Sequence, residues 1–132
     1  MPAEPEFPRW LSDAANGLAS GDVDAWTQMY ADDAVHEFPF AAPGALQRLE
    51  GKKAIRGFMA AVGERIRFGT WDDVRVRELG DEVVVEAEGH HVDAQTGVPF
   101  DMRYLWIITR QADRITRLRD YMGPRLPASE KR

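Results

Sequence analysis

The chain contains no cysteine, which excludes disulfide bonds, thiol nucleophiles and thiolate metal sites. It also has no apolar run close to the roughly 20 residues of a membrane-spanning helix. Basic residues are fewer than acidic ones, 17 against 22, and the formal net charge is -5. Nucleic acid is not an expected partner, because its binding depends on clustered basic side chains that neutralise phosphates. A membrane is not an expected partner either, because the chain has no such apolar run.

At 132 residues the chain is expected to form a single domain over residues 1–132, with an ordered core at about 8–124 and a polar tail at 125–132. Its N-terminus has neither the basic start nor the apolar core of a signal peptide. The expected location is therefore cytoplasmic.

The first half of the chain has the apolar spacing of helices. One helix begins at Pro8 and ends before Gly21, a second runs from the capping residue Asp22 to about Tyr30, and a third covers Lys53 to about Arg67. A short strand is expected at 35–38. Residues 41–50 are expected to form a loop that rims a pocket.

The second half has strand character at about 70–79, 82–92, 99–110 and 114–122, with turn signals between the segments. Helices followed by strands indicate an α+β domain with an antiparallel meander.

One of these strands, at 99–110, has two different faces. Asp101 and Arg103 share one face, and an apolar set shares the other: Met102, Tyr104, Trp106 and Ile108. The alternation alone leaves open whether the apolar set lines a cavity or forms an interface, because a β-bulge would reverse it. If the apolar face were exposed, a two-fold interface would bury it, which favours a homodimer.

Two ionisable residues stand out because each shares a strand face with apolar residues. His36 precedes Phe38 by two positions, and Asp120 alternates with Leu118 and Met122. An unpaired carboxylate in apolar surroundings is a stronger base than one in water. The alternative interpretation is structural: a hydrogen-bonded core histidine and a solvated aspartate near a strand end.

Other polar residues give weaker signals. His90 and His91 are adjacent on a strand and point to opposite faces, which is poor geometry for binding one metal ion. A hydrogen-bonded or exposed role is expected for His91 rather than a place facing the cavity. The pair Asp32 and Asp33 is expected to end the second helix in solvent. No metal site and no cofactor are therefore expected.

The order of these segments resembles a known superfamily. The motifs are Gly-Asp at 21–22, Tyr-Ala-Asp-Asp-Ala at 30–34, Leu-Glu-Gly at 49–51 and Arg-Asp-Tyr at 119–121. In this order the chain resembles nuclear transport factor 2, ketosteroid isomerase and the SnoaL-type polyketide cyclases. The resemblance implies a cone-shaped α+β fold: three N-terminal helices packed in a strongly bent antiparallel sheet that encloses an apolar cavity, commonly in a homodimer.

The catalytic residues of ketosteroid isomerase are absent from the matching positions of this chain. The isomerase's general-base carboxylate falls on Phe38, its first-helix tyrosine on Ala14, and the aspartic acid of its oxyanion hole on Leu105. Without these three groups that isomerisation has no machinery in this chain.

The limonene epoxide hydrolase version is met in part. Asp120 matches the carboxylate that activates water in those enzymes. Their water-binding tyrosine and asparagine correspond to His36 and Phe38, and their Arg-x-Asp pair corresponds to Ala87 and Gly89. The acid that protonates the opening epoxide is therefore missing from its usual place, so His36 or another donor would have to replace it.

The cyclase version loses least, because it requires mainly one carboxylate in an apolar cavity. The resemblance implies that Asp120 removes a proton from an apolar carbonyl compound while His36 assists. The expected wall of the binding cavity consists of Trp26, Tyr30, Phe38, Phe58, Met59, Leu118 and Met122. Two alternatives stay open: water activation of the epoxide hydrolase type, and a non-catalytic dimeric protein that binds an apolar ligand.

Overall fold

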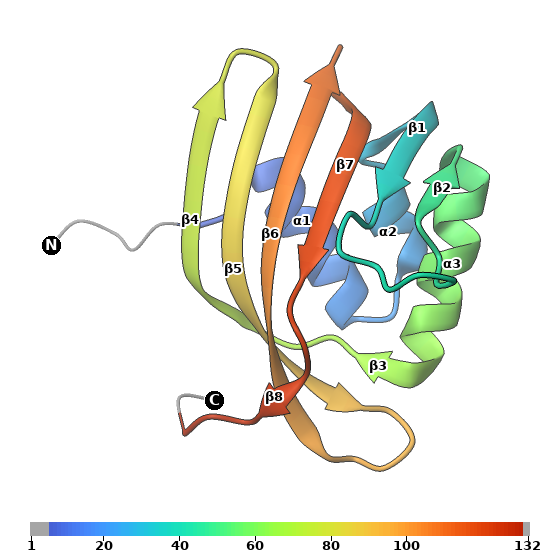
Figure 1. Cartoon of the computed structure of the whole chain (residues 1–132). Helices are drawn as coiled ribbons and strands as arrows, with labels where there is room; N and C mark the ends of the chain where they lie inside the picture. Colours follow the sequence, from blue (N-terminus) through green and yellow to red (C-terminus); the bar gives the residue numbers. More distant parts are fainter. Residues whose placement is uncertain (1–5, 131–132) are drawn as a thin grey trace, which may run out of the picture.

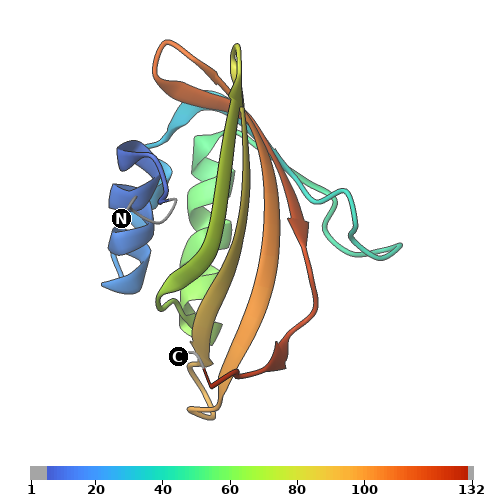
Figure 2. The ribbon, with the colours of Figure 1, turned by 90° about the vertical axis from the view of Figure 1, so that its left-hand side faces the viewer.

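The computed structural model describes residues 6–130. Its three helices fall in the first half of the chain, with two strands between the second and the third, and they lie on one side of a bent sheet (Figures 1 and 2). They are α1 at Arg9–Ala19, α2 at Val23–Thr27 and α3 at Lys52–Arg65. The residues that α1 buries form one stripe at helical spacing: Leu11, Ala14, Ala15 and Leu18.

Helix α2 begins as the sequence predicts and ends earlier. The Asp22 side chain accepts hydrogen bonds from the backbone N–H groups of Asp24 and Ala25, which is the expected N-cap. The helix stops at Thr27 because Tyr30 already opens strand β1 and pairs with Ile115. The prediction of a helix to about Tyr30 was therefore too long.

Eight strands form one sheet with the order β2-β1-β7-β6-β5-β3, in which β4 also pairs with β5 and β8 with β6. The longer strands are β1 (Tyr30–Glu37), β4 (Trp71–Leu79), β5 (Glu82–Asp93), β6 (Pro99–Gln111) and β7 (Arg114–Met122). The shorter strands are β2 (Arg48–Glu50), β3 (Ile66–Arg67) and β8 (Leu126–Pro127). The expected α+β fold with a strongly bent sheet is confirmed.

The sheet differs from the expected antiparallel meander in one pairing. Strand β1 runs parallel to β7, and this pairing carries a register shift between Tyr30 and Val35. The sheet is therefore mixed. The parallel contact brings the N-terminal half of the chain against its last long strand, so His36 lies beside Leu118 in the register.

The apolar face of β6 points to the helices and not outward. Tyr104, Trp106 and Ile108 are 8%, 3% and 0% exposed and belong to the hydrophobic core. These residues are covered within the single chain, so an exposed apolar face that a partner copy must cover is absent from this strand and that expectation is wrong. Self-association stays a prediction, and sedimentation of the purified protein would test it.

Three further segments differ from expectation. Asp32 and Asp33 are exposed, as predicted, but they lie on β1 and do not end a helix. Residues 48–50 of the expected loop form β2. The expected tail is held in part, since β8 pairs with β6 and the Ser129 N–H donates to Asp101. Among residues 6–130 no helix is long and apolar enough to cross a membrane.

Candidate functional site

A cavity of about 330 Å³ lies between the inner face of the sheet and the helices. Its polar wall atoms come from few side chains, among them Asp120, His36 and Tyr104. Most of the wall is apolar or aromatic and includes Trp26, Phe38, Phe58, Met59, Phe68, Trp71, Met102, Trp106 and Met122. An apolar cavity with a few convergent polar groups is the usual form of a small-molecule site.

Asp120 is held in this wall by two N–H donors. It lies on β7 directly opposite Trp106 of β6, and the Trp106 indole N–H donates to its Oδ1 at 3.0 Å. The His36 Nε2 lies 3.0 Å from its Oδ2. Asp120 is only 9% exposed. The carboxylate is thus fixed in orientation, and each oxygen keeps acceptor capacity beyond the bond it already makes.

His36 continues the hydrogen-bond chain away from the cavity. An ionised carboxylate only accepts, so His36 Nε2 carries the proton that it shares with Asp120. In the neutral ring Nδ1 then accepts, and the Tyr30 hydroxyl 3.0 Å away is the donor. Burial, followed by the negative charge of Asp120, raises the pKa of Tyr30 far above its ordinary value, so Tyr30 stays protonated.

A second, outer pocket of about 240 Å³ shares Asp120 with the cavity. Four residues line both: Phe38, Phe58, Asp120 and Met122. The outer pocket is completed by Phe40, Ala41, Ala45 and Leu46, from the segment between β1 and β2 that was expected to rim a pocket. This segment projects beyond the sheet in Figure 2. Asp120 therefore stands where an inner and an outer compartment meet.

Some of the expected binding residues line the cavity, and others lie in the hydrophobic core. Trp26, Phe38, Phe58, Met59 and Met122 line the cavity. Tyr30 and Leu118 do not line it: both are fully buried in the core, and Tyr30 is linked to the site through its hydrogen bond with His36.

Several wall residues were not predicted from the sequence. Trp106 is the partner of Asp120, and Tyr104, Trp71 and Phe68 complete the aromatic lining. The alternation along 99–110 already grouped Tyr104 with Trp106. Pairing Trp106 with Asp120 across the hairpin would have placed that group on the inner face.

His91 lies on the helix-facing side of the sheet but is not among the residues that line the cavity. Its imidazole lies between the rings of Phe68, Trp71, Phe100 and Tyr104. It is fully buried and hydrogen-bonded, which agrees with the expected hydrogen-bonded role.

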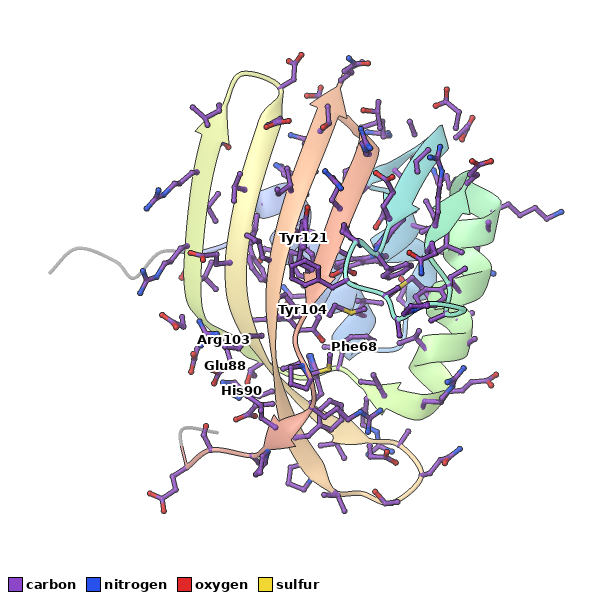
Figure 3. The ribbon with its side chains drawn as sticks, in the orientation of Figure 1. Phe68, Glu88, His90, Arg103, Tyr104 and Tyr121 are labelled. Carbon is purple, nitrogen blue, oxygen red and sulfur yellow. The ribbon has the colours of Figure 1, made fainter. Side chains whose placement is uncertain are left out.

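His90 points to the outer face, where Glu88 and Arg103 lie close to it (Figure 3). Its Nδ1 is 2.8 Å from Asp101 and its Nε2 is 3.1 Å from Asp72. Burial lowers the pKa of His90, but the hydrogen bonds with Asp101 and Asp72 outweigh burial and the net shift is upward. Burial raises the pKa of Asp101, and the hydrogen bonds with His90 and Ser129 outweigh this effect and bring it to about 2.

Within residues 6–130, Asp72, Glu88 and His90 are the only group that offers three metal-ligand atoms within 4.8 Å of one another. Both nitrogens of His90 face carboxylates, which is the arrangement of a protonated imidazole. A protonated imidazole has no lone pair for a metal ion. This cluster is therefore an ion-pair network on the outer face.

The SnoaL-like domain model matches residues 11–118. The chain belongs to the SnoaL-like family. The uncharacterized protein YesE of Bacillus subtilis is 34% identical over 107 residues, covering 78% of this chain and 71% of the relative. The resemblance predicted from the motifs is thus confirmed at the level of family.

Solved structures confirm the fold. A Bacillus subtilis structure described as a "putative isomerase" has a TM-score of 0.80 and 29% identity, covering 87% of this chain and 84% of that one. A "putative polyketide cyclase" from Xanthomonas campestris has a TM-score of 0.72 over 86% of this chain and 87% of that one. Its identity of 20% supports the fold alone.

Proposed function

We propose that this protein is a cofactor-independent enzyme that removes a proton from the carbon next to a carbonyl in an apolar ring compound. The observation that carries this proposal is the carboxylate of Asp120, oriented by two N–H donors in the wall of an apolar cavity. The name of the 29% identical solved relative, a "putative isomerase", agrees with chemistry of this type.

Asp120, and not His36, is the group that meets the substrate. Both ring nitrogens of His36 are occupied, one by Asp120 and one by Tyr30, and the residue is only 2% exposed. Asp120 borders both the cavity and the outer pocket and keeps free lone pairs. We therefore assign Asp120 as the general base and His36 as the residue that positions it.

The reaction demands little more than this base. A hydrogen beside a carbonyl is acidified because the electron pair of the broken C–H bond moves to the carbonyl oxygen. The proton passes to a carboxylate oxygen of Asp120, and the rigid hold of Trp106 and His36 keeps that oxygen aimed. A positioned general base contributes about 10²–10⁴-fold to such a step.

The size of the cavity limits the substrate. Its volume of about 330 Å³ is at the lower end of the range for small-molecule sites, about 300–1,000 Å³. A fused two-ring ketone such as 2-tetralone is a suitable probe. Its most acidic hydrogens lie between the ring and the carbonyl, and their exchange with deuterium can be followed by proton NMR.

The test is deuterium exchange of 2-tetralone in heavy water with the wild type and with Asp120→Asn. We expect the wild type to accelerate exchange over buffer and the variant to lose about 10²–10⁴-fold of that acceleration. Asp33→Asn, which removes an exposed carboxylate from the strand that carries His36, is the matched control and should exchange like the wild type.

Two results would contradict the proposal. One is an Asp120→Asn variant that keeps the full exchange rate. The other is a wild type that binds 2-tetralone but exchanges it no faster than buffer, which would support the non-catalytic ligand-binding protein.

A further inference from the structure

Tyr104 lines the cavity, and the hydrogen bonds of its hydroxyl group have a fixed direction. The backbone N–H of Gly69 donates to His91 Nδ1 at 3.2 Å. Because this nitrogen accepts, the proton of the neutral His91 ring sits on Nε2. Nε2 lies 3.0 Å from the Tyr104 hydroxyl oxygen and donates to it.

The Tyr104 hydroxyl must therefore donate its own proton elsewhere. The acceptor that the described residues provide is the thioether sulfur of Met102 at 3.7 Å. A thioether is a weak acceptor. A carbonyl oxygen in the cavity would replace it with a stronger hydrogen bond.

Tyr104 lies close to Asp120 on the inner face of the sheet. Tyr104 pairs with Met122 across the β6–β7 hairpin, and Trp106 pairs with Asp120. Tyr104 and Asp120 are thus diagonal neighbours, and such positions are about 7–8 Å apart, within reach of aromatic side chains. A carbonyl and its neighbouring C–H can bridge two groups separated in this way.

The fold makes room for the histidine that orients Tyr104. A Cβ on Gly89 would overlap the His91 imidazole and crowd the Trp71 ring, and a Cβ on Gly69 would overlap the His90 carbonyl oxygen. Both glycines therefore permit the close approach that places His91 behind Tyr104. The register pairs Ala87 of β5 with Tyr104, and this small side chain also leaves space beside the phenol.

We propose that Tyr104 binds the carbonyl oxygen of the substrate and stabilises the enolate oxygen that forms there, with His91 as its positioning residue. The inference rests on the proposed proton abstraction by Asp120. In that step the C–H bond breaks, the proton goes to Asp120, and the electron pair becomes negative charge on the oxygen that Tyr104 faces. Tyr104 keeps its proton throughout and acts as a hydrogen-bond donor.

The electrostatic surroundings of Tyr104 agree with that role. Burial, followed by the charge of Asp120, raises the pKa of Tyr104 well above its ordinary value. The phenol therefore stays protonated at neutral pH and remains available as a donor.

The test compares two ligands of nearly equal shape. 2-Tetralone has a carbonyl, and tetralin has none. Both are titrated into the full-length wild type and Tyr104→Phe by calorimetry. We expect the variant to bind 2-tetralone about tenfold more weakly, the effect of one lost hydrogen bond, and to bind tetralin as the wild type does. The exchange rate at saturating 2-tetralone should also fall.

Control variants separate the roles. Tyr121→Phe removes the hydroxyl group of a β7 tyrosine that contacts Phe40 and does not line the cavity. It should change neither the 2-tetralone nor the tetralin affinity. His91→Leu should lower the ratio of 2-tetralone to tetralin affinity by less than Tyr104→Phe does. A purely structural role for His91 would weaken both ligands equally and leave the ratio unchanged.

The outcomes also distinguish this inference from the proposed function. Asp120→Asn should lose exchange while keeping the affinity ratio. If Tyr104→Phe weakens both ligands alike, or neither, Tyr104 does not recognise the carbonyl, whatever Asp120 does. Tetralin binding by each variant reports that its cavity is folded, so a misfolded protein cannot imitate a positive result.

Discussion

Replacing Asp120 by Asn tests the hydrogen-bond chain, because an amide has one acceptor oxygen where the carboxylate has two. The Trp106 N–H can only donate, so it takes the Asn oxygen. The Asn NH₂ group then faces His36 Nε2, which must accept. We expect His36 to change tautomer, with its proton on Nδ1 and directed at the oxygen of Tyr30, which can accept as well as donate.

The cost of this change is small. Hydrogen bonds to a charged group contribute about 1.5–3 kcal/mol each and neutral ones about 0.5–1.5 kcal/mol. The loss over two bonds is about 2–3 kcal/mol, and the lower cost of burying a neutral amide offsets part of it. We expect the free energy of unfolding to fall by no more than about 2 kcal/mol.

Asp120→Leu is the variant with which the expected loss of unfolding free energy in Asp120→Asn is compared. It leaves the N–H groups of Trp106 and His36 without an acceptor, at about 1–3 kcal/mol each, so the free energy of unfolding should fall by about 2–6 kcal/mol.

Chemical denaturation of the wild type and both variants gives these free energies, and nitrogen NMR of the imidazole rings gives the tautomer. His36 is assigned by its absence from the spectrum of His36→Phe. A Leu variant more stable than the Asn variant would contradict the expected cost of leaving the two N–H groups without an acceptor. An unchanged His36 tautomer in the Asn variant would refute the proposed order of donors.

Three further predictions concern stability. His36→Phe should lower the free energy of unfolding by about 2–5 kcal/mol, measured by denaturation, because it leaves the Tyr30 hydroxyl and the Asp120 carboxylate without their partner. Gly89→Ala should cost about 1–3 kcal/mol by overpacking against His91, and should also lower the 2-tetralone to tetralin affinity ratio; an unchanged ratio would argue against the positioning role. The pair of His90 and Asp101 should stabilise the fold most between about pH 4 and pH 6.5. Asp101 contributes its stabilising free energy above its ordinary pKa of 3.8, and this contribution is lost as the pH falls toward its folded-state pKa of about 2. His90 contributes below its ordinary pKa of 6.5, and this contribution is lost as the pH rises through its raised pKa. The stability difference between wild type and Asp101→Asn should therefore shrink as pH rises above 6.5, and a constant difference would contradict this assignment.

The sequence alone singled out His36 and Asp120, the two residues at the centre of the proposed site, because both signals are local. His36 and Phe38 share a strand face, and Asp120 shares one with Leu118 and Met122, so alternation alone placed each ionisable group among apolar neighbours. The distance between the two groups depends on the parallel pairing of β1 with β7. That pairing joins segments far apart in the chain, and no local pattern encodes it.

Which side chains of β6 line the cavity could be decided only from its pairing with other strands. Both faces of β6 carry large side chains, and the pairing of β6 with β7 has a register irregularity between Thr109 and Arg110. The alternation of side chains along the strand therefore did not identify which face points to the helices. The inner face follows once Trp106 is set opposite Asp120. The orientation of His91 likewise depends on Gly89, because the space for its imidazole exists only where a neighbouring residue lacks a Cβ.

If the proposed reaction is correct, the arrangement of polar groups would orient a bound ketone. Tyr104 lines the inner cavity only, whereas Asp120 also borders the outer pocket under residues 40–46. In the proposed binding mode a carbonyl oxygen held by Tyr104 would point inward, and the acidic carbon would lie beside Asp120. Any longer part of the molecule would extend outward past Phe38 and Phe58. Because most of the wall on both sides of Asp120 is apolar, a substrate that fills both compartments should be largely apolar as well. The proposed order would also give the two donors of Asp120 a role. A substrate that spans both compartments would present its C–H bond at one point along the cavity, and the carboxylate would have to be aimed at that point.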